Sequence, residues 1–241
     1  NSVQTLTDLS REIEISAFDN TAIVLSFKLS DYYKSVEIFD VSNAVNLTSN
    51  YAVENTDGNY TITINNSNYT HLNFRFGAKS YKMIYMPNRP SSAGDSLVNY
   101  TLGSNRGTLD ETGYELTVWF DNIVNSVNYL GVTLVGHDFV EWNSLASGEG
   151  TSLTIDNTPI NESFVTDATE SSAFNVYAIW TVKQITVTFD VNDPTTTGYG
   201  STTAEREGAA TSHEYNYNDE YGEYLPNNTN LRRDGYTLDG W

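Results

Sequence analysis

Residues 94–97 read Gly-Asp-Ser-Leu, the block that carries the nucleophilic serine in one family of esterases. Such a serine needs a histidine as general base and a third group that orients the histidine. That esterase fold is parallel α/β, with the serine near the start of the chain and a late Asp-x-x-His. This sequence has none of these features, since Ala210 stands where His213 would need an aspartate. A short motif without its context carries little weight, so we expect Ser96 to have no catalytic role.

The other residues that could do chemistry are scattered. His71, His137 and His213 lie far apart, without Glu or His at metal-ligand spacing, and we expect His137 to be a surface or half-buried strand residue. Cysteine is absent, which excludes disulfides, thiol catalysis and cysteine zinc sites together. The sequence has no Gly-rich phosphate loop and no nucleophile elbow. We therefore predict that the chain is not an enzyme.

Two acidic clusters raise the question of calcium. Neither has the Asp-x-(Asp/Asn)-x-(Asp/Asn)-Gly spacing of a calcium loop, so we interpret both as solvated acidic turns. We predict no cofactor, and calcium is the one ion that the acidity leaves open. The clusters are Asp190, Asn192 and Asp193, and Asn218, Asp219 and Glu220.

Seven Asn-x-Ser/Thr sequons are candidate glycosylation sites. Asn, Ser and Thr are so frequent in this chain that about six sequons would arise by chance. Four of the seven fall between residues 46 and 70, on predicted turns, and modification would concentrate there. The seven asparagines are Asn46, Asn59, Asn65, Asn68, Asn99, Asn161 and Asn227.

Composition excludes several partners. The 31 acidic and 12 basic residues give a net charge of −19, which argues against nucleic acid and against anionic lipid surfaces. No stretch of 18 apolar residues is present, so we predict no membrane span. Apolar residues make up 39% of the chain and aromatic residues 13%, which is enough for packed cores.

Two segments of the chain are imperfect copies of each other. Residues 115–121 (Glu-Leu-Thr-Val-Trp-Phe-Asp) match residues 184–190 (Gln-Ile-Thr-Val-Thr-Phe-Asp), 69 positions later. Each is followed by Gly-x-x-(Phe or Leu)-x-x-Trp, which begins at Gly136 in the first copy and at Gly235 in the second. Self-similarity at a fixed period marks a modular array, which supplies length and surface more often than chemistry.

The motif has a packing reason. Alternating apolar residues put one row of side chains on one face of a strand, and the glycine permits the positive φ of a tight turn. Leu238 and Trp241 are three apart, so they share a face only if a β-bulge intervenes, for which we suggest Gly240. In the first copy we expect one buried aromatic cluster of Trp142, Trp180, Phe139 and Phe120.

These motifs, with Asn-Val-Tyr-Ala-Ile-Trp at 175–180 and Tyr-Gly-Glu-Tyr-Leu-Pro at 221–226, resemble the Listeria–Bacteroides repeat. This family, also called the internalin B-repeat, occurs in tandem on bacterial cell-surface proteins. The resemblance covers residues from about 114 to 241, a little over half of the chain, and is closer in the second copy. It implies a compact β-grasp-like fold for each repeat, with a helix or turn crossing the sheet.

The first copy departs from this pattern. Only 15 residues separate Phe120 from Gly136, against 45 between Phe189 and Gly235. Residues 113–119 also fit the Gly-x-x-Leu-x-x-Trp spacing, and residues 81–85 have the composition of the opening strand of a further copy. Both registers stay open.

The first hundred residues consist mostly of β-branched and aromatic runs separated by polar turns, which predicts a β-sandwich. Only residues 7–13 look helical, with a cap at Thr7. The linker candidates are residues 87–94 and 103–113. The strand-like runs are residues 21–29, 36–39, 60–64, 72–76 and 81–85.

The predicted organisation is therefore mainly β, an N-terminal β-sandwich followed by tandem small β-grasp-like repeats. We place a β-sandwich-like domain at 1–112, one repeat module at 113–182 and a second, truncated module at 183–241. The second module lacks its closing strand and the chain starts without Met, so we expect the natural protein to continue beyond Trp241 and to have lost a signal peptide.

These features favour an extracellular structural or adhesive protein of the cell surface, with neighbouring subunits or host and cell-surface ligands as partners. The alternative is a self-assembling subunit of an extracellular filament, sheath or surface layer. In that case residues 1–9 or 22–29 would complete the sheet of a neighbour. A third interpretation is a binding module of a secreted hydrolase.

Overall fold

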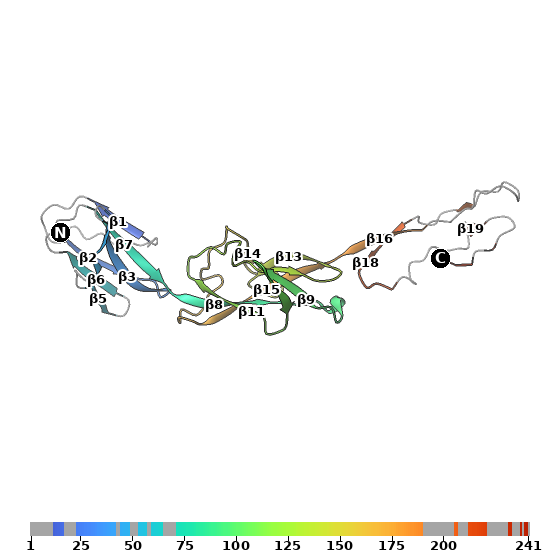
Figure 1. Ribbon diagram of the computed structural model, residues 1–241, viewed down its shortest axis with the longest axis horizontal. Helices are drawn as coiled ribbons and strands as arrows, with labels where there is room; N and C mark the ends of the chain where they lie inside the picture. The colour runs from blue at the N-terminus through green and yellow to red at the C-terminus, as the bar shows by residue number, and fades with distance from the viewer. Residues whose placement is uncertain are drawn as a thin grey trace.

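A computed structural model describes residues 12–16, 23–41, 44–48, 53–56, 59–64, 71–189, 205–206, 212–220, 231–232, 237 and 239–240. Within these residues the protein is mainly β, as predicted, and it contains the short 3-10 turn η2 (Ser91–Ala93). The sheets follow one another along the long axis of the molecule (Figure 1).

The N-terminal part contains two antiparallel sheets. Alternate residues of β6 and β3 are buried, and the ring of Phe27 lies 5.6 Å from that of Phe76, so the two sheets meet in one core. One sheet has the order β1 (Glu12–Ser16), β7 (His71–Ala78), β3 (Tyr33–Asp40), β4 (Val45–Asn46). The other has the order β2 (Ile23–Lys28), β6 (Asn59–Ile64), β5 (Val53–Thr56).

The predicted helix at residues 7–13 is wrong where the structure describes it. Glu12 and Ile13 belong to β1, which pairs with β7, and residues 7–11 lie outside the described residues. The sequence Glu-Ile-Glu-Ile-Ser of β1 alternates with a period of two, which suits a strand rather than a helix.

The middle part is built on a mixed five-stranded sheet. β8 and β15 run parallel at its centre, and the other pairs are antiparallel. β8 contains residues 81–85 and pairs with β11 and β15. The predicted domain boundary between residues 112 and 113 therefore falls between strands of one sheet. The order is β11 (Tyr114–Trp119), β8 (Ser80–Met86), β15 (Ala173–Val182), β13 (His137–Asn143), β14 (Ser152–Leu153).

A second sheet, ordered β10 (Asn105–Leu109), β9 (Val98–Leu102), β12 (Gly131–Thr133), belongs to the same part of the chain. Gly113 and Gly136, which precede β11 and β13, have φ of +80° and +72°. Both glycines therefore enter their strands in a left-handed conformation, whereas Gly235, for which a positive φ is predicted, lies outside the described residues.

A β-bulge places the aromatic residues of β13 on one side. The register between β13 and β15 shifts between Phe139 and Glu141, so Val140 is the extra residue. Phe139 therefore contacts Trp142 at 5.5 Å and Trp180 at 5.6 Å between ring centroids. The predicted aromatic cluster is confirmed for these three residues, of which Trp142 is fully buried and the other two are half-buried.

Phe120 is also buried, but its ring packs on Tyr32 and Tyr33 of the N-terminal part. The expectation that it joins the tryptophans is wrong in this respect. Burial still alternates from Val118 to Phe120, and the N–H of Phe120 binds the Lys79 carbonyl beyond the end of β8. Phe120 therefore lies past the end of the sheet, where Tyr32 and Tyr33 cover it.

Tyr81 and Tyr85 occupy the same buried face of β8 in different polar environments. The Tyr81 hydroxyl has no hydrogen-bond partner among the described residues, whereas the Tyr85 hydroxyl donates to the Asn128 carbonyl at 3.0 Å. Burial raises the pKa of Tyr81 to about 12 from an ordinary value of 10.0, and it also raises the pKa of Tyr85. Both phenols stay protonated where an unfolded tyrosine would ionise, so the free energy of unfolding should fall as pH rises from 10.0 towards about 12.

Replacing these tyrosines with phenylalanine should have opposite effects. Tyr81→Phe removes an unsatisfied buried hydroxyl and should raise the free energy of unfolding by about 1 kcal/mol, while Tyr85→Phe loses a hydrogen bond and should lower it by about as much. Urea unfolding at neutral pH measures both. A change in the same direction for the two variants would contradict this assignment.

The C-terminal part contains two-stranded pairs. β16 (Gln184–Thr188) pairs with β18 (Ser212–Asn216), and β17 (Glu205–Arg206) pairs with β19 (Leu231–Arg232). Gly235, Leu238 and Trp241 lie outside the described residues, so the bulge suggested at Gly240 stays a prediction.

Candidate functional site: two module joints and a surface pocket

A single residue, Lys79, separates the N-terminal part from the middle part. It stands between the end of β7 and the start of β8. Its N–H donates to the carbonyl of Tyr32 at 2.9 Å, and its carbonyl accepts the N–H of Phe120 at 3.0 Å. The N–H of Lys79 is therefore bound by the N-terminal part and its carbonyl by the middle part. We call this connection joint 1.

Aromatic packing surrounds joint 1. The rings of Tyr32 and Phe120 are stacked with centroids 4.4 Å apart, and Tyr33 meets Phe120 edge-on at 5.7 Å. The Tyr33 hydroxyl donates to the Asp121 carboxylate, and the Tyr32 hydroxyl donates to the Val165 carbonyl at 3.1 Å. These contacts join the turn before β3 to the loops of the middle part.

An ion pair between Lys34 and Glu170 also crosses joint 1. The hydrogen bond from Lys34 lowers the pKa of the Glu170 carboxyl. Both side chains are exposed, so we expect this pair to contribute little beside the aromatic contacts.

The same arrangement recurs 104 residues later, counting from Lys79 to Lys183. Lys183 is the single residue between β15 and β16. Its N–H donates to the Gly136 carbonyl at 2.9 Å, and its carbonyl accepts the N–H of Tyr217 at 2.9 Å. The chain thus uses one backbone pattern at both joints, and we call this one joint 2.

His137 is the central side chain of joint 2. It is 4% exposed, so the expectation of a surface or half-buried residue is wrong. Its Nδ1 lies 3.0 Å from the Val135 carbonyl, and its Nε2 lies 2.8 Å from Ser92 Oγ. A carbonyl can only accept, so Nδ1 carries a proton and donates to Val135, while Nε2 and the Ser92 hydroxyl share the second hydrogen bond. The turn at Gly136 brings the imidazole beneath η2 and beside Tyr217.

The Ser92–His137 pair has the hydrogen bond of a nucleophile with its base. A backbone carbonyl, rather than a carboxylate, orients the second nitrogen of the histidine. The Asn218 side-chain amide donates to the backbone carbonyl of Ser92 at 2.9 Å, which connects the turn after β18 to η2. Both members of the pair thus contact the turn after β18, Ser92 through its carbonyl and His137 through the ring of Tyr217.

No histidine is hydrogen-bonded to Ser96, the serine of the esterase-like block, among the described residues. It is Ser92, four positions before Ser96, that hydrogen-bonds to a histidine. The ring of His213 lies against Tyr215 in β18, and His71 lies in β7.

The candidate glycosylation sites lie apart from the joints. Asn46, Asn59 and Asn99 are exposed, and Asn161 is half-buried. Asn46 ends β4 and Asn59 begins β6, so the expectation that they lie on turns is wrong. Each takes part in the pairing of an adjacent strand. Asn65, Asn68 and Asn227 lie outside the described residues.

The acidic clusters give no metal geometry where they can be followed. Among the described residues, no group of three or more His, Asp or Glu side chains could hold a metal ion. Asp219 accepts the N–H of Asn216 at 2.8 Å, which closes the turn after β18. Residues 190–193 lie outside the described residues. In the part of the chain that the structure describes, no helix is long and apolar enough to cross a membrane.

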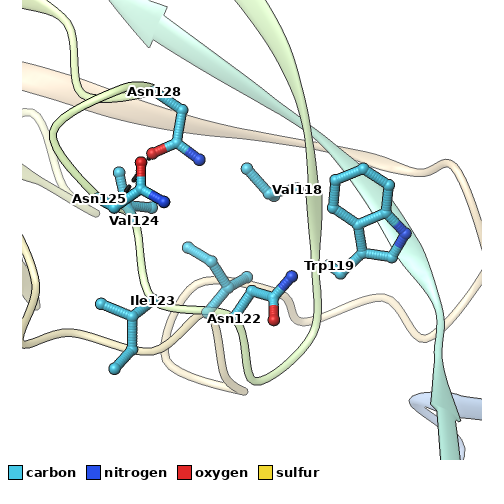
Figure 2. A pocket seen from close by; sticks show the side chains of 8 residues that line it. Val118, Trp119, Asn122, Ile123, Val124, Asn125 and Asn128 are labelled. Atoms are coloured by element: carbon cyan, nitrogen blue, oxygen red, sulfur yellow. Dashed lines mark hydrogen bonds between the residues drawn. The ribbon is translucent and has the colours of Figure 1, made fainter.

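A pocket of about 320 Å³ opens beside the end of β11, where the chain enters residues 122–128 (Figure 2). Val118, Val124 and Ile160 are buried and form its floor. The side chains of Asn122, Asn125 and Asn128 surround it. Trp119 and Ile123 also line the pocket. Sequence reasoning missed this pocket, because three asparagines in seven residues read as turn formers.

Comparison with known proteins gives no relative. No family model, no curated protein and no solved structure matches the chain.

Proposed function

We propose that this protein is an extracellular structural component of a cell surface, a stiff stalk built of β modules. The two N-terminal sheets, which meet through Phe27 and Phe76, support a β-sandwich as the first module. The mixed order β11-β8-β15-β13-β14, with β8 and β15 parallel, supports a β-grasp-like second module. The resemblance to tandem surface repeats supports the location outside the cell.

The observation that carries this proposal is the repeated one-residue joint. Flexible linkers are several residues long and rich in Gly and Ser, whereas Lys79 and Lys183 leave no free length. Bending at either joint breaks two backbone hydrogen bonds and separates packed side chains. Neighbouring modules should therefore move as one body. Such stiffness suits a stalk that holds its outer end at a fixed distance from the cell.

Distance measurements between spin labels test the stiffness. The chain has no cysteine, so two can be introduced at exposed positions without interference. Glu37→Cys with Thr117→Cys spans joint 1, and Thr117→Cys with Glu214→Cys spans joint 2. We expect a single narrow distance distribution for each pair. Broad distributions in both would show that the modules are flexibly linked and would overturn the stalk.

Phe120→Ala should loosen joint 1 selectively. The substitution removes the stacking on Tyr32 and the edge contact with Tyr33, but it leaves joint 2 intact. The distribution across joint 1 should broaden while that across joint 2 stays narrow. Equal broadening across both joints would mean that Phe120 supports the fold of the middle part rather than the joint.

A strand-exchanged filament is the second candidate function. It is favoured by the position of β1 at the edge of its sheet, directly after the N-terminal segment. Edge strands are templates for pairing with another chain. Deleting residues 1–9 should then abolish polymers seen by electron microscopy and leave the repeats folded. Normal assembly of the truncated chain, or a monomeric full chain in the presence of calcium, would favour the stalk.

A further inference from the structure

We propose that the pocket between β11 and residues 122–128 binds a neutral saccharide. This binding is a separate property from the stiffness of the joints, and neither depends on the other. The pocket combines directed amide donors, a buried apolar floor and an absence of charged lining residues.

The donors come from asparagines whose oxygen atoms are already engaged. Asn125 Oδ1 accepts the N–H of Val127 at 3.0 Å, and Asn128 Oδ1 accepts the N–H of Asn125 at 2.8 Å. These bonds determine which end of each amide is oxygen. The two NH₂ groups have no hydrogen-bond partner among the described residues. Figure 2 shows both nitrogens directed into the space between the two asparagines and Val118.

The loop that carries these donors is held in place before any ligand arrives. The carbonyl of Asn122 accepts the N–H of Ile160 at 3.0 Å, and the Ile160 carbonyl accepts the N–H of Asp121 at 2.7 Å. The Val124 carbonyl accepts the N–H of Asp156 at 3.0 Å. A preformed site avoids the entropic cost of ordering a loop on binding.

The lining selects against charged ligands. It consists of amide and apolar side chains without a charged one, so an ion would lose hydration without meeting an opposite charge. The net charge of −19 adds a general repulsion of anions. Amide NH₂ groups require acceptor oxygens, and Val118, Val124 and Ile160 favour an apolar surface.

A sugar ring meets both requirements, because its C–H face is apolar and its oxygen atoms lie around the edge. A volume of about 320 Å³ stands at the small end of ligand pockets. It therefore suits one or two sugar rings. An extended peptide is the competing ligand, and the experiment includes it.

The test is a titration of the full-length protein followed by NMR of the side-chain NH₂ signals of Asn125 and Asn128. The probes are the methyl glycosides of N-acetylglucosamine, galactose, glucose and mannose, with sodium acetate and a tri-alanine peptide as competing classes. We expect at least one glycoside to shift both NH₂ signals in a saturable manner, and neither acetate nor peptide to do so.

Two variants remove the donors and keep the loop. Asn125→Asp and Asn128→Asp retain the oxygen that closes the turn but replace NH₂ with a charged acceptor, so each should weaken glycoside binding by about tenfold or more. Asn105→Asp adds the same charge at an exposed position in β10 and should leave binding unchanged. Unshifted backbone signals of β8 and β15 confirm that the variants are folded.

Several results would overturn the proposal. They are a lack of response to all four glycosides, a stronger response to acetate or peptide, and equal weakening by Asn105→Asp. The titration does not depend on how the modules are oriented. A negative titration would therefore not contradict the stalk, and broad spin-label distances would not contradict the sugar site.

Discussion

Replacing Trp142 with alanine should lower the free energy of unfolding of the middle part by about 3–5 kcal/mol. Trp142 is 0% exposed, and its ring meets those of Tyr85 at 4.7 Å and Phe139 at 5.5 Å. Its Nε1 donates to the Leu130 carbonyl at 2.8 Å. The substitution therefore opens a cavity in the core and leaves a buried carbonyl without its donor.

Trp119→Ala is the matched control. Trp119 lies in β11 of the same sheet but is 46% exposed, so its loss should cost about 1 kcal/mol or less. Urea unfolding followed by the fluorescence of the remaining tryptophans compares the two variants. A cost for Trp142→Ala no greater than that for Trp119→Ala would mean that Trp142 does not anchor the module.

The strands were predictable because alternation with a period of two is a local property of the sequence. Residues 60–64 and 81–85 form parts of β6 and β8, as their composition indicates. The bulge of the first copy was less predictable, because the glycine that suggests one in the second copy is replaced by Glu141 in the first. The structure has that bulge at Val140.

The joints could not be predicted from such patterns. Tyr32 and Phe120 are brought together only when two modules dock, and nothing in either local sequence identifies the other as its partner. The burial of His137 is unpredictable for the same reason, because it depends on Ser92 and Tyr217 from distant parts of the chain. Single-residue linkers are also invisible to composition, since a lone lysine between two strands looks like a strand residue.

Gly136→Ala should disrupt joint 2 while leaving joint 1 unchanged. Gly136 has φ of +72°, where a residue with a Cβ is strained by roughly 1–2 kcal/mol. An added Cβ would also lie 2.0 Å from Cδ1 and 2.1 Å from Cγ of Tyr217. Cγ is the near end of the ring, so flipping the ring about χ2 leaves the clash in place and the whole side chain has to move.

Tyr217 cannot move away without releasing its own contacts, since its N–H is bound by the Lys183 carbonyl and the neighbouring Asn218 by the Ser92 carbonyl. We therefore expect the label distance between Thr117→Cys and Glu214→Cys to broaden or lengthen. Gly103→Ala is the control, because Gly103 has φ of +55° but nothing lies within 4 Å of the position that an added Cβ would take. That variant bears the backbone strain without the clash and should keep joint 2 narrow. If the two alanine variants behave alike, the contact between position 136 and Tyr217 does not determine the geometry of joint 2.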